Sequence, residues 1–471
     1  MNLKLGQPLP AKFVVLLGDI LIVLVSLFAS RLMQSPSGRT SSLSIHGMGL
    51  FSQGFAIGAL TTPLLPLVGI ALLFLSTFYI FDLYDLRIFG ESGALLSRLL
   101  GAGLLVLAVA SAVSFCASGM GWQAVLLQSV VMAVSVAFAW RRFFSANYSL
   151  LLKQESTAVI GSGPNAECIR DLMSRPDSHY RFSGFVHAAA GAAPGDGVLG
   201  SIAELDSLVG RHGIRQLVLA TDSIPEFAEP AITGLRFRGV GLHRSPDIAM
   251  ELSQSLPIEL LSHSWLRLTE KSNLLHRHSM RKLKRVFDIV LSMIALVFFW
   301  PLLTLCAIAI RLDSPGPVIF RQTRVGLHGK PFTIIKLRTM RHASERAPQW
   351  ARVNDERITR VGSFLRRTHI DELPQLLNVL RGEMSFVGPR PERPEFVEQL
   401  SREIPFYDVR HYLMPGITGW AQVNFRYGAS VADARRKLEF DLYYVMHASI
   451  VLDLLVVLKT VQVVLFMRGS R

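Results

Sequence analysis

Apolar residues are concentrated in the first third of the chain, in runs long enough for membrane-spanning helices. The first run covers 13–32 and includes Asp19, and the second covers 64–81. From 99 to 140 there is no charged residue, and "ASGMGWQ" in the middle of that stretch is typical of a tight turn. A bilayer core needs about 20 apolar residues per helix. The pattern therefore predicts four helical spans within residues 1–150.

Basic residues near the ends of these runs orient them, because Lys and Arg prefer the cytoplasmic side of a membrane. Arg31 and Arg39 oppose the majority, and the turn within 99–140 carries no charge. The better fit places both ends of the four-helix region in the cytoplasm. The residues that favour this orientation are Lys4, Lys12, Arg87, Arg98, Arg141, Arg142 and Lys153.

A soluble α/β pattern follows over 151–255. "STAVIGSGPNAECIRDLM" predicts a strand, a glycine turn and a helix, and Gly161, Gly163 and Ala166 match a Rossmann turn. The start of such a helix can hold a phosphate. However, the acidic residue expected for a ribose is absent after "RFSGFV", where His187 stands. Nucleotide binding and a Rossmann-like regulatory or packing domain both remain open. Residues 256–280 are interpreted as a linker.

The uncharged run 289–310 raises a separate question, because Pro301 lies in its middle. Proline removes a backbone hydrogen bond and predicts a sharp bend near 298–301. Four basic residues precede the run and Arg311 follows it, and charge of this kind at both ends favours one side of the membrane. We therefore predict a re-entrant helix over 283–311. The alternative is a kinked helix that crosses completely.

The charge of the chain is uneven. Residues 281–471 hold 29 Lys and Arg against 17 Asp and Glu, which gives +12 of the total +14. Such a basic region predicts anionic partners, such as lipid head groups, phosphorylated lipids, nucleotides or nucleic acid, or it reflects the usual basic loading of a cytoplasmic face. The chain has 3 cysteines, two of them inside apolar runs, so we expect no disulfide framework.

The most informative stretch is "FLRRTHIDELPQLLNVLRGEMSFVGPRPERPEF". Asp371 and Glu372 precede "LPQLLNVL", which predicts a helix, and carboxylates at a helix start are commonly simple caps. Here, however, Arg366, Arg367 and Arg390 stand nearby. Arginine forks bind phosphate oxygens, while a carboxylate can hold Mg²⁺ or attack phosphorus. The block therefore favours phosphoryl transfer.

This block, with "SPGPVIFRQTRVGLHGKPFTIIKLRTM" and "PGITGWAQVNFRYG", closely resembles the polyprenyl-phosphate hexose-1-phosphate transferases. These bacterial membrane enzymes start exopolysaccharide or O-antigen repeat units. The resemblance covers all of 281–471, and the four spans and Rossmann-like domain resemble the large members. It implies a polytopic helical region, a Rossmann-like α/β domain, and a membrane-associated, α-rich catalytic domain with a helix broken at Pro301.

The resemblance implies transfer of a sugar 1-phosphate from a UDP-sugar to undecaprenyl phosphate, with release of UMP. By its motif, Asp371 is the nucleophile and Glu372 helps to hold Mg²⁺. Arg390 and Arg366 bind phosphate. The resemblance implies an enzyme of the bacterial inner membrane whose catalytic domain faces the cytoplasm, where UDP-sugars are made. Glucose and galactose are the leading donors. Nucleic acid is not an expected partner, and homo-oligomers are compatible with the sequence.

Several assignments stay open. Arg338 in "KLRTM" is a candidate phosphate ligand or a surface strand arginine, and Arg367 is a further candidate. Trp420 and Gln422 are expected to shape the site without an assigned role. The helix over 449–467, with Asp453 and Lys459, is expected to lie on the membrane surface or on a partner chain.

Two other functions are considered. One is a membrane-anchored nucleotide-sugar dehydratase or epimerase, but the Tyr-x-x-x-Lys pair that such enzymes use is absent from this sequence. The other is a non-catalytic scaffold of a polysaccharide export complex.

Overall fold

The computed structural model divides the chain into two compact units, 1–153 and 154–471, which are described separately. Helices predominate, and the strands belong to the second unit. The residues that the structure describes are 11–33, 64–85, 89, 91–117, 123–151, 154–175, 178–188, 197–221, 225–268, 278–341, 357–425 and 430–466.

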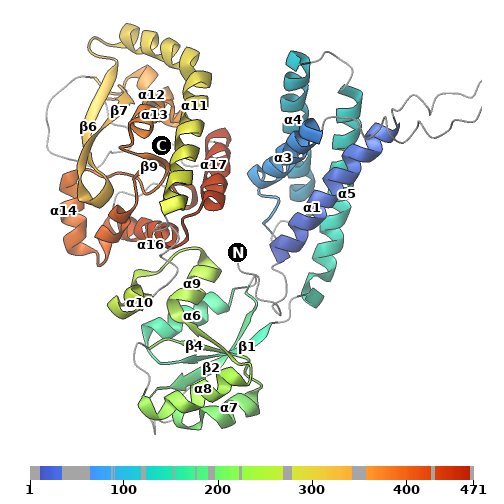
Figure 1. Cartoon of the computed structure of the whole chain (residues 1–471), viewed down its shortest axis with the longest axis vertical. Helices are drawn as coiled ribbons and strands as arrows, with labels where there is room; N and C mark the ends of the chain where they lie inside the picture. Colours follow the sequence, from blue (N-terminus) through green and yellow to red (C-terminus); the bar gives the residue numbers. More distant parts are fainter. Residues whose placement is uncertain are drawn as a thin grey trace, which may run out of the picture. The chain divides into compact units, whose positions relative to one another are not determined.

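In its described residues, the first unit consists of helices α1 (Ala11–Met33), α3 (Leu64–Ile80), α4 (Ser92–Ala117) and α5 (Gln123–Leu151), which lie side by side (Figure 1). Their packed core contains Phe74, Phe78, Leu95 and Leu99, while large apolar side chains such as Phe28 are exposed on the outside. Apolar residues on both the inner and outer faces are typical of helices surrounded by lipid.

The predicted helices of this region are confirmed, although not all of them are equally long. Within the described part of the chain, three segments are long and apolar enough to cross a bilayer: Ser92–Val113, Leu126–Asn147 and, in the second unit, Met280–Asp313. Val14–Ser30 and Val68–Ile80 are shorter apolar helices. Four complete crossings therefore stay a prediction.

A buried ion pair joins two helices of this unit. Arg141 on α5 donates to both carboxylate oxygens of Asp19 on α1, at 2.9 and 2.7 Å, and both side chains are fully buried. The guanidinium also lies over the ring of Phe78. Since Arg141 is neutralised inside the helix group, it adds no charge at a membrane face and does not support the predicted orientation.

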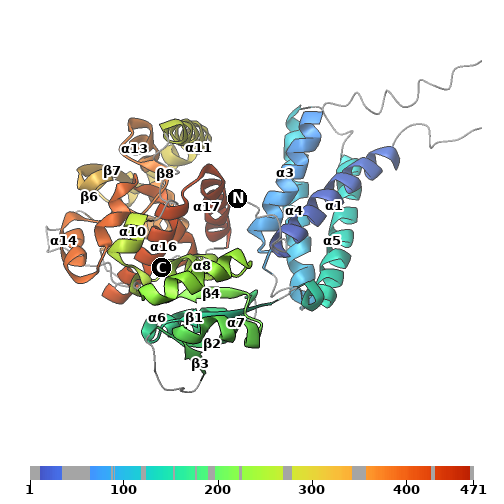
Figure 2. The same ribbon diagram turned by 60° about the horizontal axis from the view of Figure 1, so that its bottom comes forward.

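The second unit begins with the predicted parallel α/β domain, which is confirmed. Five parallel strands lie in the order β3-β2-β1-β4-β5. Alternate residues of β1 face opposite layers: Ala158 and Ile160 pack with α7 and α8, and Val159 packs with α6 and α9. Figure 1 shows α7 and α8 on one side of the sheet and α6 and α9 on the other, and Figure 2 shows the strands of this sheet from a second direction. The strands are β1 (Glu155–Ile160), β2 (Tyr180–His187), β3 (Val198–Ser201), β4 (Gln216–Leu219) and β5 (Gly241–Arg244); the helices are α6 (Pro164–Met173), α7 (Leu205–His212), α8 (Glu229–Phe237) and α9 (Ser245–Ser253), with short 3-10 helices η4 (Ile202–Glu204) and η5 (Glu226–Ala228).

The predicted glycine turn lies between β1 and α6. Gly161 has φ 125°, and Gly163, the residue before α6, has φ 90°. Both values lie where residues with a side chain are rarely found. The turn thus has the expected backbone, and nucleotide binding there stays a prediction.

The segment interpreted as a linker, 256–280, contains buried residues. Leu256 and Trp265 pack into one cluster with Leu438 and Leu442 of the region that follows, and the amide of Leu256 donates to the carbonyl of Glu439 at 3.0 Å. This part of the segment is therefore core, and it joins the α/β domain to the C-terminal region. It contains η6 (Ile258–Leu260) and α10 (His263–Leu268).

The C-terminal region combines helices with two small sheets. β6 (Ile319–Val325) and β7 (Pro331–Leu337) form an antiparallel hairpin through η8 (Leu327–Gly329), and β8 (Ser385–Val387) pairs in parallel with β9 (Gly416–Thr418). The helices are α11 (His278–Asp313), α12 (Arg360–Thr368), η9 (Ile370–Gln375), α13 (Leu376–Arg381), α14 (Pro394–Glu403), η10 (Tyr407–Tyr412), α15 (Trp420–Asn424), α16 (Val431–His447) and α17 (Ile450–Leu465).

Helix α11 contains Pro301 and is one continuous helix of 36 residues. Its ribbon nevertheless bends sharply near its upper end in Figure 1, as a proline without an N–H predicts. Both ends of the helix contact the C-terminal region. Asp288 accepts hydrogen bonds from Ser385 and Phe386, while Ile310 packs beside Leu337. Between these ends lie exposed apolar residues, namely Val290, Met293, Ile294, Val297, Phe298, Trp300, Leu305 and Ile308.

Helix α17 turns its charged residues inward. Asp453 is fully buried and accepts a hydrogen bond from Lys284 at 2.7 Å, and Lys459 donates to Asn424 at 2.7 Å. The opposite face is apolar and exposed at Val451, Leu454, Val461 and Leu465. This arrangement fits the expected position against a membrane or another chain, which stays a prediction.

Candidate active site

Asp371 and Glu372 lie in a short 3-10 helix, η9, directly after α12. His369 ends α12 in the left-handed conformation, with φ 57°, which is uncommon for a residue other than glycine. This conformation turns the chain so that η9 leaves in a new direction. The sequence predicted a helix here, and the structure has η9 followed by the short helix α13.

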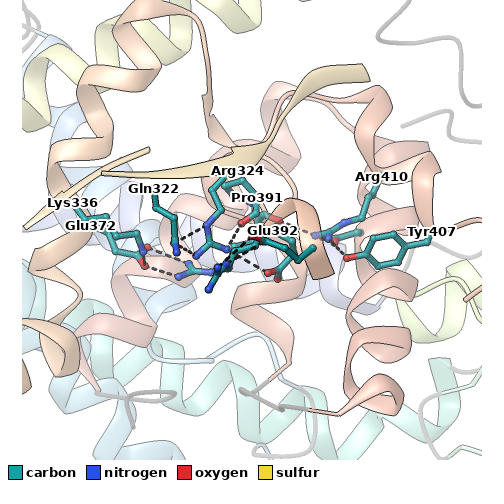
Figure 3. Close-up of polar contacts among 12 residues, drawn as sticks. Gln322, Arg324, Lys336, Glu372, Pro391, Glu392, Tyr407 and Arg410 are labelled. Atoms are coloured by element: carbon teal, nitrogen blue, oxygen red, sulfur yellow. Dashed lines mark hydrogen bonds and ion pairs between the residues drawn. The ribbon is translucent and has the colours of Figure 1, made fainter. Parts of the chain in front are cut away.

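Glu372 is buried between two cations from other elements. Its Oε1 accepts from Nζ of Lys336 on β7 at 2.7 Å and from Nη2 of Arg390 at 2.5 Å. Its Oε2 accepts from Nη1 of Arg390 at 3.1 Å. Figure 3 shows Lys336 and Glu372 at one end of a continuous line of polar contacts. The hairpin, η9 and the segment after β8 therefore meet at this carboxylate.

Asp371 has different surroundings. It is 9 % exposed, and no described residue donates a hydrogen bond to its carboxylate. Burial and the adjacent charge of Glu372 raise the pKa of Asp371 to about 6, although Lys336, Arg390 and Arg366 act in the opposite direction. An ionised carboxylate without hydrogen bonds keeps its electron pairs available for attack on an electrophile.

Glu372 is held ionised. Burial opposes its charge, yet Arg390 and Lys336 outweigh burial and hold the pKa of Glu372 well below its usual range. Two neighbouring carboxylates are thus pushed in opposite directions. Such a difference in pKa is typical of two neighbouring carboxyl groups that have separate catalytic roles.

The segment "GPRP" that carries Arg390 is held by close backbone contacts. The amide of Gly388 donates to Thr418, and the amide of Gly416 donates to Pro389, both at 2.9 Å. A Cβ on Gly388 would lie 2.3 Å from the carbonyl oxygen of Met414. Because only glycine allows this approach, "GPRP" and "PGITG" lie directly against each other, which holds the backbone just before Arg390.

The other predicted arginines differ in their surroundings. Arg366 is close enough to lower the pKa of Asp371, whereas Arg367 is exposed. Arg338 is buried, and its guanidinium donates to Ser314 and Pro315 after α11. Within the described residues, these hydrogen bonds go to the segment after α11 and none goes to the carboxylate pair, so Arg338 joins the end of β7 to α11. The phosphate roles of these three arginines stay predictions.

Trp420 and Gln422 contact the surroundings of the site rather than its carboxylates. Nε1 of Trp420 donates to the carbonyl of Gln254 at 2.9 Å, and its ring stacks on Tyr443. The side-chain amide of Gln422 donates to the carbonyl of Ile417 at 3.0 Å. Trp420 therefore connects the α/β domain to the C-terminal region.

Sequence reasoning missed Lys336. In "TIIKL" this lysine stands alone among apolar strand residues, and a charged residue in such a strand needs a buried partner. That signal could have identified it. Arg410 and Asp441, which also lie near the site, were missed for another reason: they are 31 positions apart and become partners only in the folded chain.

The expected Mg²⁺ is compatible with the residues present. Asp371 and Glu372 supply carboxylate oxygens, and magnesium is commonly held by one or two carboxylates together with water and substrate phosphates. Among the described residues, Oε2 of Glu372 accepts a hydrogen bond from Arg390, and a carboxylate oxygen has capacity for a further contact. In the described residues, no cluster of three His, Cys, Asp or Glu side chains could form an all-protein metal site.

Comparison with known proteins identifies the C-terminal region. The bacterial sugar transferase family matches residues 279–467. A UDP-glucose:undecaprenyl-phosphate glucose-1-phosphate transferase of Caulobacter vibrioides is 46% identical over 209 residues, which are 44% of this chain and 78% of that protein. The chain belongs to the bacterial sugar transferase family. The family predicted from the motifs is thereby confirmed.

Other relatives match a stretch of similar length. The exopolysaccharide production protein PSS of Rhizobium leguminosarum is 46% identical over 189 residues, or 38% of this chain and 93% of that protein. A UDP-N-acetylgalactosamine-undecaprenyl-phosphate N-acetylgalactosaminephosphotransferase of Aeromonas hydrophila is 49% identical over 190 residues, or 40% of this chain. The match spans only 45% of that relative's length.

Proposed function

We propose that this sugar transferase moves a sugar 1-phosphate from a UDP-sugar to undecaprenyl phosphate, as a membrane step in bacterial polysaccharide synthesis. The observation that carries the proposal is the contrast at the carboxylate pair. Glu372 is fixed by two cations, whereas Asp371 has no hydrogen-bond donor among the described residues. The names of the relatives support the substrate classes.

In the first step, a carboxylate oxygen of Asp371 attacks the phosphorus that bears the sugar. The bond from this phosphorus to the bridging oxygen breaks, and UMP leaves with the electron pair. An oxygen of undecaprenyl phosphate then attacks the same phosphorus and displaces Asp371. The product is undecaprenyl diphosphate sugar, and the carboxylate is regenerated without a net proton transfer.

The cations in the site have to offset the charge of these anions. Lys336 and Arg390 neutralise Glu372 and the developing charge nearby, and Arg366 adds a third cation close to Asp371. Fixed cations of this kind lower the barrier to attack by one anion on another. Mg²⁺ held by Glu372 and the substrate phosphates would supply the remaining positive charge.

The shape of α11 supports a re-entrant arrangement at the cytoplasmic face of the inner membrane. Lys284 near the start of α11 and Asp313 at its end both contact the C-terminal region, although a straight helix would separate these two residues by about 44 Å. The apolar middle is exposed. A hairpin that dips into one leaflet explains both facts and keeps the site where a lipid phosphate and a soluble nucleotide meet.

The test is UMP release by purified full-length protein in detergent, with undecaprenyl phosphate, Mg²⁺ and UDP-glucose, UDP-galactose and their N-acetyl forms. Release from one donor only when the lipid is present would establish the transferase and its sugar. Folded protein that is inactive with all four donors would contradict the proposal and favour the scaffold. A sugar phosphate on Asp371, detected by mass spectrometry after mixing with donor alone, would identify the covalent intermediate.

A further inference from the structure

Arg410 is a buried residue that the proposed reaction does not itself use. It lies in η10 and is 6 % exposed. Nη1 donates to the hydroxyl of Tyr407 at 2.8 Å, and Nη2 donates to Oδ2 of Asp441 on α16 at 2.8 Å. Arg410 is thus held from two sides by partners that are themselves buried.

The same Nη2 makes a third hydrogen bond, to the carbonyl oxygen of Arg390, at 2.9 Å. Figure 3 shows Arg410 and Tyr407 at the opposite end of the line of polar contacts from Lys336 and Glu372. The line therefore runs from the buried Arg410 to the backbone of Arg390, and from the side chain of Arg390 to Glu372.

We propose that Arg410, fixed by Asp441 and Tyr407, is a positioning residue that sets the backbone of Arg390 and thereby aims its guanidinium at Glu372 and the substrate phosphate. The effect expected on activity rests on the proposed function, whereas the effect expected on the backbone of Arg390 does not. A planar guanidinium suits this task because it donates in several fixed directions at once. The flanking Pro389 and Pro391 have no amide with which to hold the loop.

The alternative is that the Arg410–Asp441 pair only stabilises the fold. Replacing both members of a buried ion pair by apolar residues often preserves stability, so Arg410→Met with Asp441→Leu separates the two interpretations. Asp19→Leu with Arg141→Met is the matched control, since it removes a buried arginine–aspartate pair of similar geometry from the first unit.

The first measurement is amide hydrogen exchange of residues 386–393 in the full-length protein. We expect exchange about tenfold faster or more in the Arg410/Asp441 variant, and no change there in the control. Unchanged exchange in a folded variant would overturn the proposal. This result does not depend on activity, so it decides the structural claim even if UMP release fails and the proposed function falls.

The second measurement is a double-mutant cycle on kcat/KM for UMP release. The Arg410/Asp441 variant should lose about tenfold or more in the native background, but less than about threefold when Arg390 is already alanine. Equal losses in both backgrounds would indicate a purely structural pair. If the apolar variant does not fold, Arg410→Lys serves instead. Lysine keeps a positive charge beside Asp441 but lacks the guanidinium that donates in several fixed directions. We expect a larger loss of kcat/KM in the native background than in the Arg390→Ala background, with both losses smaller than for the apolar variant.

Discussion

Two buried arginine–carboxylate contacts in this protein show how similar chemistry leads to different outcomes. Asp19 and Arg141 form a closed pair in which both carboxylate oxygens accept from one guanidinium. Glu372 also accepts from one guanidinium with both oxygens, but Lys336 adds a second cation and Asp371 adds a second carboxylate. The first arrangement is complete by itself. The second keeps one carboxylate without a hydrogen-bond donor among the described residues, and that carboxylate can react.

The largest effect is expected for Asp371→Asn. An amide cannot attack phosphorus, so UMP release should fall by about 10³-fold or more. Stability should not decrease, because no described residue donates a hydrogen bond to this carboxylate and its neighbour Glu372 would lose a repulsive charge. Activity and thermal unfolding are measured on the same preparation. Retained UMP release would show that Asp371 is not the nucleophile.

The next effect concerns the metal. Lys336 and Arg390 are balanced by the charges of Asp371 and Glu372, so among these residues mainly Arg366 is left to offset the charge of an incoming diphosphate. Removing Mg²⁺ with EDTA should abolish UMP release, and added Mg²⁺ should restore it. The melting temperature of the substrate-free protein should change little, because Glu372 keeps its two cations. Undiminished activity in EDTA would contradict a role for the metal.

A smaller effect is expected for Lys336→Met, which removes one of the two cations beside Glu372. Loss of one charged donor in a preorganised site typically costs about 10²-fold in rate. Lys330→Met is the matched control, because Lys330 is exposed and precedes the same strand; its activity should stay within about twofold. If both variants behave alike, Lys336 has no role in the reaction.

The smallest effect on activity, and a large one on stability, is expected for Asp19→Leu. This change leaves Arg141 buried without its partner, which typically costs about 3–5 kcal/mol. Asp19→Leu with Arg141→Met should recover most of that loss. UMP release per folded molecule should stay within about twofold in the double variant. A strong loss of activity there would mean that the first unit contributes to catalysis, and the comparison would no longer hold.

The sequence predicted what depends on local pattern. The strand, glycine turn and helix at Gly161 and the helices of the first unit follow from periodicity and composition, and the structure confirms them. The motif around Asp371 predicted the family. The adjacency of Asp371 and Glu372 is also local, so their common position in η9 needed no long-range knowledge.

Contacts between distant residues were not predictable in this way. Asp19 and Arg141 are 122 positions apart, so from the sequence Arg141 is simply one of several basic residues that favour an orientation of the membrane region. From the sequence, Arg338 is a candidate phosphate ligand or a surface strand arginine, and its phosphate role stays a prediction. Its neighbour by two positions, Lys336, contacts Glu372, and this contact depends on how the hairpin packs against η9, which no local pattern records.

The two anchored ends of α11 have a consequence for how stable this region is. Its exposed apolar middle is held in place only while the C-terminal region is folded, because Asp288 and Ile310 are fixed by that region. In the proposed re-entrant arrangement, lipid that prefers this bent helix would act as a ligand of the native state, and binding to the native state alone raises stability by mass action. The length and packing of the lipid acyl chains would therefore change the free energy of unfolding of the C-terminal region.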